Sequence, residues 1–391
     1  EHAKTAARVI EHEHHRRLKH NITWTPEDPK VQEYDCPWTP EDHTPKTIHE
    51  VRPRDIQAIG ALGDSLTAAF GARSWNLLNI ANWKEYRGIS WSGGGRDPVN
   101  TQSSLPSIIK HFQPTGYMRG YATAETPVKE GPLDTEHAHL NQARTAARCD
   151  ALPAKVDGGK DWLGQPGEVA NFTRVGRDEL GTAFDKVWKL VTIFIGANDL
   201  CWACPCDGCN ATREAASNYK DQVATALDFL HKNSPRTFVA IVLPVDPTRL
   251  FPIKSGLCST LHGALCGCGT SDDESWRADV SKHTAEYNKV LEEIVAKYDD
   301  EDEFAAVIQP FFVDTYPPKK PDGSYDKSYF APDCFHFSAK AHAQAGLALW
   351  NNLIQPVGSK RTDWHYGEQI TCPPNDQYLC TKKNKGQGHG C

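Results

Sequence analysis

The sequence predicts an α/β protein in which helices cover both faces of a parallel β-sheet. Four apolar runs without polar alternation lie along the chain, and helical patterns lie between or after them. Strands buried on both faces have such continuous apolar runs, and strands that alternate with helices pair in parallel. A chain of 391 residues can form one large domain of this kind with insertions. We therefore expect three layers, α/β/α, around a sheet of about five strands.

The predicted elements follow one another along the chain in a regular order. The runs that predict strands are residues 56–62, 190–195, 237–243 and 304–308. The helical patterns lie near residues 214–232, 277–298 and 338–354. Two further segments, 71–135 and 244–275, are rich in Gly, Pro and Trp and are predicted to be long loops.

The N-terminal part of the chain has a different composition. Residues 1–50 are polar and rich in His and Pro, so they are predicted to form an extended N-terminal segment. Residues 11–17 within it carry His and Glu side chains that could ligate a metal. A solvated helix or tail is the preferred interpretation, because metal ligands normally have packed supporting partners. We expect no metal site in the chain.

Composition and cysteine content favour the secretory pathway. Thirteen cysteines are many for a reducing compartment, and three N-x-[ST] sequons offer glycosylation sites at Asn21, Asn171 and Asn210. We expect a secreted, extracellular protein that begins at Glu1 after removal of a signal peptide. Because thirteen is odd, at least one thiol is free or forms an intermolecular disulfide.

Charge and hydropathy exclude two classes of partner. The net charge is −7 and no run of Lys and Arg forms a stripe, so no nucleic-acid partner is expected. No apolar stretch approaches the roughly 18 residues of a membrane span, so any contact with a membrane or lipid surface is expected to be peripheral or to be made by a segment missing from this chain.

Polar motifs follow two of the predicted strands. Gly63-Asp64-Ser65-Leu66 follows the first strand, and Gly196-Ala197-Asn198-Asp199 follows the second. Active sites of such sheets lie beyond the carboxyl ends of the strands. Taken alone, Ser65 is equally well explained as a helix N-cap or as a nucleophile.

An Asp-x-x-His motif near the C-terminus changes this balance. Asp333 precedes His336 by three residues on a predicted loop, so its carboxylate can accept the Nδ1 proton and turn Nε2 toward a nucleophile. Together with Ser65 this forms the order Ser, Asp, His, which is a rare combination by chance.

These motifs resemble those of the GDSL, or SGNH, hydrolase superfamily, and specifically its phospholipase B branch. The similar blocks are 61–68, 86–92, 194–201, 332–338 and 348–358. A further block that contains Ala146 spans 140–148 and leads into Leu152-Pro153. The resemblance runs from about residue 50 to about residue 380, and block 332–338 is its most specific part. It implies the three-layer, flavodoxin-like SGNH fold over 51–358, followed by a Cys-containing C-terminal tail, 359–391.

The resemblance also implies a role for each site residue. Ser65 would be the nucleophile, His336 the general base and then acid, and Asp333 the residue that orients His336. The oxyanion hole would consist of the N–H of Ser65, the N–H of Ala146 and the side-chain amide of Asn198. The implied substrate is a phospholipid, a lysophospholipid or another ester, with no cofactor.

Ala146 departs from the family, which has glycine at this position. Alanine keeps the N–H donor, but it adds a Cβ and makes a positive φ costly. We expect Ala146→Gly to relieve crowding of bulky esters and to lower stability by under about 1 kcal/mol, because glycine disorders the unfolded chain.

The cysteines and aromatic residues leave alternatives open. Cys201, Cys204, Cys206 and Cys209 could form a zinc knuckle, but disulfides behind Asn198 are preferred in an oxidising compartment. Cys334 is expected to form a bridge that holds the catalytic loop. Two interpretations fit the aromatic residues in 71–120 equally well: they line an acyl groove or lid, or they pack the loop onto the sheet.

Two alternative functions remain at this point. One is an esterase for carbohydrate or small esters. The other is a catalytically weak member of the family that serves as a secreted binding, matrix or storage protein. Ala146 favours the weak member, whereas intact Ser65, Asp333 and His336 oppose it.

Overall fold

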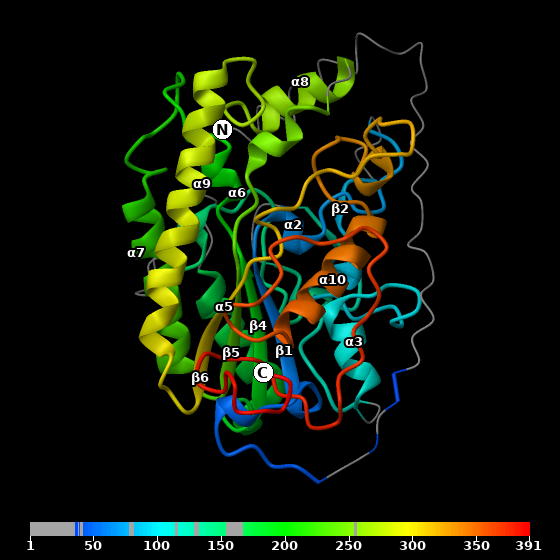
Figure 1. The fold of residues 1–391 in the computed structure, drawn as a ribbon, viewed down its shortest axis with the longest axis vertical. Helices are drawn as coiled ribbons and strands as arrows, with labels where there is room; N and C mark the ends of the chain where they lie inside the picture. Colours follow the sequence, from blue (N-terminus) through cyan, green and yellow to red (C-terminus); the bar gives the residue numbers. More distant parts are fainter. Residues whose placement is uncertain are drawn as a thin grey trace.

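The computed structural model describes most of the chain (Figure 1). The described residues are 36–37, 39, 42–77, 82–113, 116–128, 133–153, 167–253 and 256–391. The sequon at Asn21 and the His-rich run 11–17 lie outside them, as does most of the predicted N-terminal segment.

A parallel sheet forms the centre of the fold, as the apolar runs predict. Its strands are β1 (Ile56–Gly63), β4 (Trp188–Phe194), β5 (Thr237–Val242) and β6 (Phe304–Gln309). They lie in the order β1-β4-β5-β6, and every neighbouring pair is parallel. All four predicted strands are therefore confirmed.

The sheet has four strands rather than about five. Residues 140–144 run beside the free edge of β1 without forming a regular strand: the N–H of Ala61 donates to the Leu140 carbonyl at 3.1 Å, and the N–H of Gln142 donates to the Ala61 carbonyl at 2.9 Å. This segment occupies the place of the second strand in a flavodoxin-like order 2-1-3-4-5. It also carries the chain directly into the block that contains Ala146.

Helices cover both faces of the sheet, which confirms the three layers (Figure 1). One apolar core joins one face of the sheet to α5 (Glu168–Leu180), α7 (Ala216–Asn233) and α9 (Glu274–Val295). The other core joins the opposite face to α3 (Leu105–His111) and α10 (Ala339–Leu353). Successive strand residues alternate between the cores, since Ala240 packs in the second and Ile241 in the first.

Short elements gather at the carboxyl end of the sheet, where α2, α6 and α8 lie (Figure 1). They are α2 (Ser65–Ala68), α6 (Ala197–Leu200) and α8 (Gly256–Leu265). The predicted loop 71–135 contains α3, the antiparallel pair of short strands β2 (Lys84–Glu85) and β3 (Thr126–Pro127), and the first residue of α4 (Thr135–Ala138), while 244–275 contains α8. These segments therefore carry local structure of their own. Among the described residues, no helix is long and apolar enough to span a bilayer.

All thirteen cysteines lie in the described residues. Twelve form the pairs Cys36–Cys372, Cys201–Cys266, Cys204–Cys268, Cys206–Cys209, Cys258–Cys334 and Cys380–Cys391. Cys149 is the remaining thiol, and it is buried. Burial makes an intermolecular disulfide at Cys149 unfavourable. A disulfide content this high is typical of an oxidising compartment.

The two described sequons differ in exposure. Asn210 lies exposed in the loop after α6. Asn171 lies in the first turns of α5 and is only 8% exposed. A glycan on Asn171 would have to displace helix packing, so the structure favours Asn210 over Asn171 as an acceptor.

Candidate active site

Ser65 lies where β1 turns sharply into α2. Gly63 has φ +142°, and a Cβ on it would collide with the Phe194 carbonyl on the neighbouring strand. Its N–H donates to the Glu168 carboxylate at 2.7 Å. Asp64 then caps α2 by accepting from the N–H of Leu66 at 2.9 Å. The turn therefore places Ser65 at the first position of a helix, beyond the end of a buried strand.

Asp64 is a buried carboxyl group next to Ser65. Its Oδ1 accepts from Leu66, while Oδ2 has no hydrogen-bond partner among the described residues. Burial raises the pKa of Asp64 to about 7 from an ordinary value of 3.8, and the Leu66 hydrogen bond and nearby His336 only partly oppose this.

Ser65, His336 and Asp333 form a hydrogen-bonded chain. Ser65 Oγ lies 2.9 Å from His336 Nε2, and His336 Nδ1 lies 2.6 Å from Asp333 Oδ2. A carboxylate at Nδ1 requires the proton there, so Nε2 is left to accept the serine proton. The structure thus brings together the three residues that the sequence places 268 and 3 positions apart.

The loop around Asp333 fixes this geometry. Asp333 Oδ1 accepts from the N–H groups of Phe335 and His336, each at 3.0 Å. Burial by itself would raise the pKa of Asp333, but the charge of His336 and these hydrogen bonds outweigh it and lower the pKa below its usual range. Phe70 packs edge-on against the His336 ring with centroids 4.8 Å apart.

Asn198 and Ala146 lie on adjacent loops. Asn198 is in α6, which begins after Gly196 at φ +117°. One N–H of its amide donates to the Ala147 carbonyl at 2.8 Å. This bond orients the Nδ2 group and leaves its second hydrogen available for another acceptor. The loops that carry two of the expected oxyanion donors are therefore joined directly.

The backbone at Ala146 is left-handed, with φ +67°. The N–H groups on either side of it are occupied: Thr145 donates to Glu85 at 3.1 Å and Ala147 donates to the Arg144 carbonyl at 3.1 Å. Within the described part of the chain, the N–H groups of Ala146 and Ser65 have no acceptor. Two of the expected oxyanion donors thus have no acceptor among the described residues.

This conformation overturns the expected effect of Ala146→Gly on stability. An alanine in the left-handed region is strained by roughly 1–2 kcal/mol relative to glycine. The relief of this strain exceeds the entropic cost of glycine in the unfolded chain, so glycine should stabilise the fold rather than weaken it.

Comparison with known proteins now supplies the family. The GDSL-like Lipase/Acylhydrolase family matches residues 59–349. The chain belongs to this family. It is 37% identical over 372 residues to "Phospholipase B1, membrane-associated" of Mus musculus and 37% identical over 367 residues to the Homo sapiens protein. These alignments cover 92% and 90% of this chain but 23% of each relative, so the chain spans about a quarter of their length.

A solved structure also matches this GDSL-like chain. It is an extracellular lipase from Streptomyces rimosus, with a TM-score of 0.37 and 15% identity, and the match covers 75% of this chain and 98% of the lipase.

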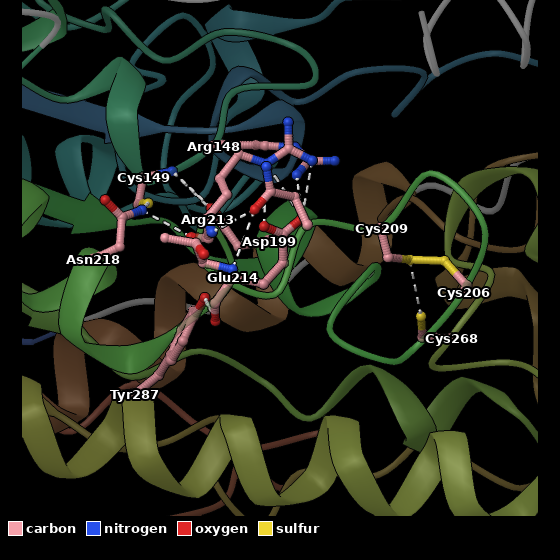
Figure 2. Close-up of polar contacts among 12 residues, drawn as sticks. Arg148, Cys149, Asp199, Cys206, Cys209, Arg213, Glu214, Asn218, Cys268 and Tyr287 are labelled. Atoms are coloured by element: carbon pink, nitrogen blue, oxygen red, sulfur yellow. Dashed lines mark hydrogen bonds and ion pairs between the residues drawn. A yellow bond between two sulfur atoms is a disulfide. The ribbon is translucent and has the colours of Figure 1, made fainter.

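A buried polar cluster supports the Asn198 and Ala146 loops of this GDSL-like chain (Figure 2). Asp199 accepts from the N–H of Cys149 at 3.1 Å, and burial raises the pKa of Asp199 to about 7. Arg148 pairs with Glu214 at 2.7 Å, with both side chains almost fully buried. The sequence analysis assigns Asp199 no role, although it lies within block 194–201, which resembles the phospholipase B branch.

A second buried network supports the other side of the Ala146 loop. Glu85 pairs with Arg87 at 2.7 Å and accepts from the Thr145 hydroxyl at 2.8 Å. Arg87, which is fully buried, also donates to the Asn141 carbonyl at 2.9 Å. Asn141 in turn donates to the Thr67 carbonyl in α2 at 3.2 Å. The network therefore connects the Ser65 helix to the Ala146 loop, and only the resemblance of block 86–92 marked this region beforehand.

The four cysteines considered for a zinc knuckle, Cys201, Cys204, Cys206 and Cys209, all form disulfides in the structure. Cys201 pairs with Cys266, and the sulfurs of Cys204, Cys206, Cys209 and Cys268 lie within 4.8 Å of one another as two disulfides. Figure 2 shows Cys206 bonded to Cys209, with Cys268 nearby.

An apolar groove begins beside the Ser65–His336 pair. It encloses about 690 Å³, including its open mouth. Leu66, Ala197 and Phe335, the chain neighbours of Ser65, Asn198 and His336, form part of its wall. Its lining also includes the aromatic rings of Phe312, Phe330, Phe337 and Trp364 and the charged side chains of Asp246 and Arg249. For the aromatic residues of 71–120 the sequence left a groove or lid and loop packing as alternatives; among the described residues none of them lines this groove, and Trp91 packs in the core.

Proposed function

We propose that this chain is a secreted serine esterase that hydrolyses carboxylic esters of phospholipids or lysophospholipids through an acyl-serine intermediate. The observation that carries the proposal is the continuous chain of hydrogen bonds from Ser65 Oγ through His336 to Asp333. Membership of a lipase and acylhydrolase family supports the same reaction type.

In the acylation step, Ser65 Oγ attacks the carbonyl carbon while its proton passes to His336 Nε2. Asp333 stabilises the imidazolium through Nδ1 and does not itself take the proton. The new oxyanion is stabilised by the N–H groups of Ser65 and Ala146 and by the second N–H of the Asn198 amide. The ester C–O bond then breaks, and His336 protonates the leaving alcohol oxygen.

Deacylation repeats these steps with water. His336 removes a proton from water, the hydroxide oxygen attacks the acyl carbon, and the acid product leaves as Ser65 regains its proton. In both steps His336 is the side chain that takes the proton from the nucleophile and returns it to the leaving oxygen.

The apolar groove supports a lipid substrate rather than a small or carbohydrate ester. It reaches Leu66, the chain neighbour of Ser65, and its wall is mostly aliphatic and aromatic, with Asp246 and Arg249 as charged exceptions, which suits a fatty-acyl chain. The relatives named phospholipase B1 support the same class, although this chain corresponds to only 23% of their length. The disulfides support secretion, with contact to lipid at a membrane surface made peripherally.

Two measurements test the proposal. Wild-type protein should react with a fluorophosphonate probe and release fatty acid from lysophosphatidylcholine, and Ser65→Ala should lose both by several orders of magnitude with unchanged stability. A Ser65→Ala protein with turnover within a few-fold of wild type would exclude Ser65 as nucleophile. A wild-type protein that neither reacts nor turns over would support the alternative of a secreted binding or matrix protein.

A pair of α10 variants tests the acyl groove. Ala341 lines the groove, whereas Ala345, one turn further along the same helix, is equally buried in the core. Leucine at either position overpacks the interior. Ala341→Leu should also displace part of a bound chain, at about 0.8 kcal/mol per methylene.

We expect Ala341→Leu to lower the ratio of kcat/KM for dodecanoyl over butanoyl esters by about tenfold, and Ala345→Leu to leave the ratio unchanged. An equal effect of both variants on the ratio would show that the acyl chain binds elsewhere. A wild-type preference for acetylated sugars over long acyl esters would favour the carbohydrate-ester alternative.

A further inference from the structure

The loop that holds Asp333 and His336 contains a strained residue. Cys334, which lies between them, has φ +60°. This left-handed conformation costs a non-glycine residue roughly 1–2 kcal/mol. It allows the chain to double back so that Asp333 Oδ1 reaches two N–H groups while Oδ2 faces His336. Such strain persists only where the surroundings over-determine it.

Helix α8 holds Cys334 at two points. Cys258 forms a disulfide with Cys334, and His262 Nε2 lies 2.8 Å from the Cys334 carbonyl oxygen. Residues 258 and 262 are one turn apart, so both reach from the same helix face. Because a carbonyl can only accept, His262 carries its proton on Nε2. Both His262 and Cys258 are almost completely buried.

The opposite end of α8 is attached to the loop of Asn198. Cys266 directly follows the helix and forms a disulfide with Cys201, which is the C-cap of α6. Beside it, the N–H of Cys268 donates to the Cys201 carbonyl at 3.0 Å, and Cys268 pairs with Cys204. Helix α8 is therefore bonded covalently to the His336 loop at one end and to the Asn198 helix at the other.

We propose that α8 is a strut that fixes the spacing between the base His336 and the oxyanion donor Asn198, and that His262 is a positioning residue for this site. The inference rests on the proposed function. His262 has no contact with the reacting atoms. It acts by holding the Cys334 carbonyl and, through it, the orientation of the Asp333–His336 pair.

The chain offers a matched control for His262. His49 is also buried, and its Nε2 lies 3.0 Å from a backbone carbonyl, that of Glu301, far from the site in sequence and structure. Burial lowers the pKa of both histidines. Replacing either by Leu removes one donor from a backbone carbonyl, and His49→Leu also removes the 2.8 Å hydrogen bond between His49 Nδ1 and Thr381 Oγ1, so the His49 variant should lose at least as much stability as the His262 variant.

We expect His262→Leu to lower kcat on a short ester by about 10- to 100-fold with KM unchanged, because small misplacements of catalytic groups are costly. His49→Leu should keep kcat within about twofold. His262→Gln, whose Nε2 can still donate, should recover most of the lost kcat. Urea unfolding of all three variants separates stability from activity.

A second pair of variants tests the covalent ends of the strut. Removing the strut disulfide by Cys258→Ser with Cys334→Ser should lower kcat, whereas Cys380→Ser with Cys391→Ser, which opens a disulfide in the tail, should not. Equal kcat in His262→Leu and His49→Leu would overturn the positioning role. Ser65→Ala, measured alongside, separates the two ideas: its retention of activity refutes the proposed function, whereas its loss with an unaffected His262→Leu refutes the strut alone.

Discussion

Replacing Ala146 by glycine should both stabilise the protein and widen its substrate range. Residue 146 has φ +67°, where alanine costs roughly 1–2 kcal/mol relative to glycine. Glycine adds conformational freedom to the unfolded chain, which costs about 0.4–1 kcal/mol. The net gain is then between about 0 and 1.6 kcal/mol. It should be measured as a higher urea midpoint at an unchanged m-value.

The effect on activity comes from the Cβ rather than from the backbone. If the Ala146 N–H faces the developing oxyanion, removing the methyl group makes room for the acyl chain and keeps the donor. Ala146→Gly should then raise kcat/KM for bulky esters more than for short ones. A wild type that is nearly inert on every ester, with glycine restoring all of them, would mean that alanine has already disrupted the oxyanion hole.

Ala146→Asn separates strain from crowding. Asparagine tolerates the left-handed region better than alanine, yet it keeps a Cβ and adds bulk. It should therefore gain stability without gaining activity on bulky esters. A glycine variant less stable than wild type would refute the strain argument, and identical rates for all three proteins on short and long esters would place Ala146 outside the oxyanion hole.

Two further outcomes follow from buried groups. The pKa of Asp64 is raised to about 7, so its contribution to stability is fully present below about pH 4 and is lost as the pH rises through 7. Asn mimics the neutral acid, so the free energy of unfolding of Asp64→Asn should match that of wild type at pH 4. At pH 8 it should exceed the wild-type value by up to about 4 kcal/mol. A difference in urea midpoints that does not change with pH would contradict this. For the thiols, intact mass after alkylation should show no label on native protein, one on unfolded unreduced protein at Cys149, and all thirteen after reduction. Stoichiometric zinc or several free thiols would contradict the disulfide assignment.

The sheet could be predicted from the sequence because its strands are buried on both faces. Runs such as 237–243 have no polar alternation, and each predicted run became a strand. The segment beside β1 has no such signal, because Asn141, Gln142 and Arg144 are polar. The N–H groups of Gln142 and Arg144 donate to carbonyls of β1, while the Asn141 side chain accepts from Arg87 and donates to the Thr67 carbonyl. Helix α5 was also not expected, since only one face, with Val169 and Phe172, enters the core.

Some contacts of the candidate site could likewise be predicted from the sequence, and others could not. Asp333 and His336 are three residues apart, so their contact is a local property of one loop and could be predicted. The contact of Asn198 with Ala147 depends on two loops that are 51 residues apart in sequence, and only the fold brings them together. Disulfide partners are likewise undetermined by spacing, because many pairings of thirteen cysteines are compatible with the sequence.

The two non-glycine residues with left-handed backbone in the expected catalytic blocks, Ala146 and Cys334, have the same structural logic. Each lies in a loop that carries an expected site group, and each loop is bound by residues from other parts of the chain. Next to Ala146, Thr145 is bound by Glu85 and Cys149 by Asp199. Cys334 is bound by α8 through a disulfide and His262. Local strain at a site is maintained only by surrounding contacts. Loss of the contacts around Ala146 or around Cys334 should therefore let the strained backbone relax, and the hydrogen-bonding groups on that loop would move with it. This is why substitutions at Glu85, Asp199 and His262, none of which reaches the reacting atoms, are expected to affect turnover more than substrate binding.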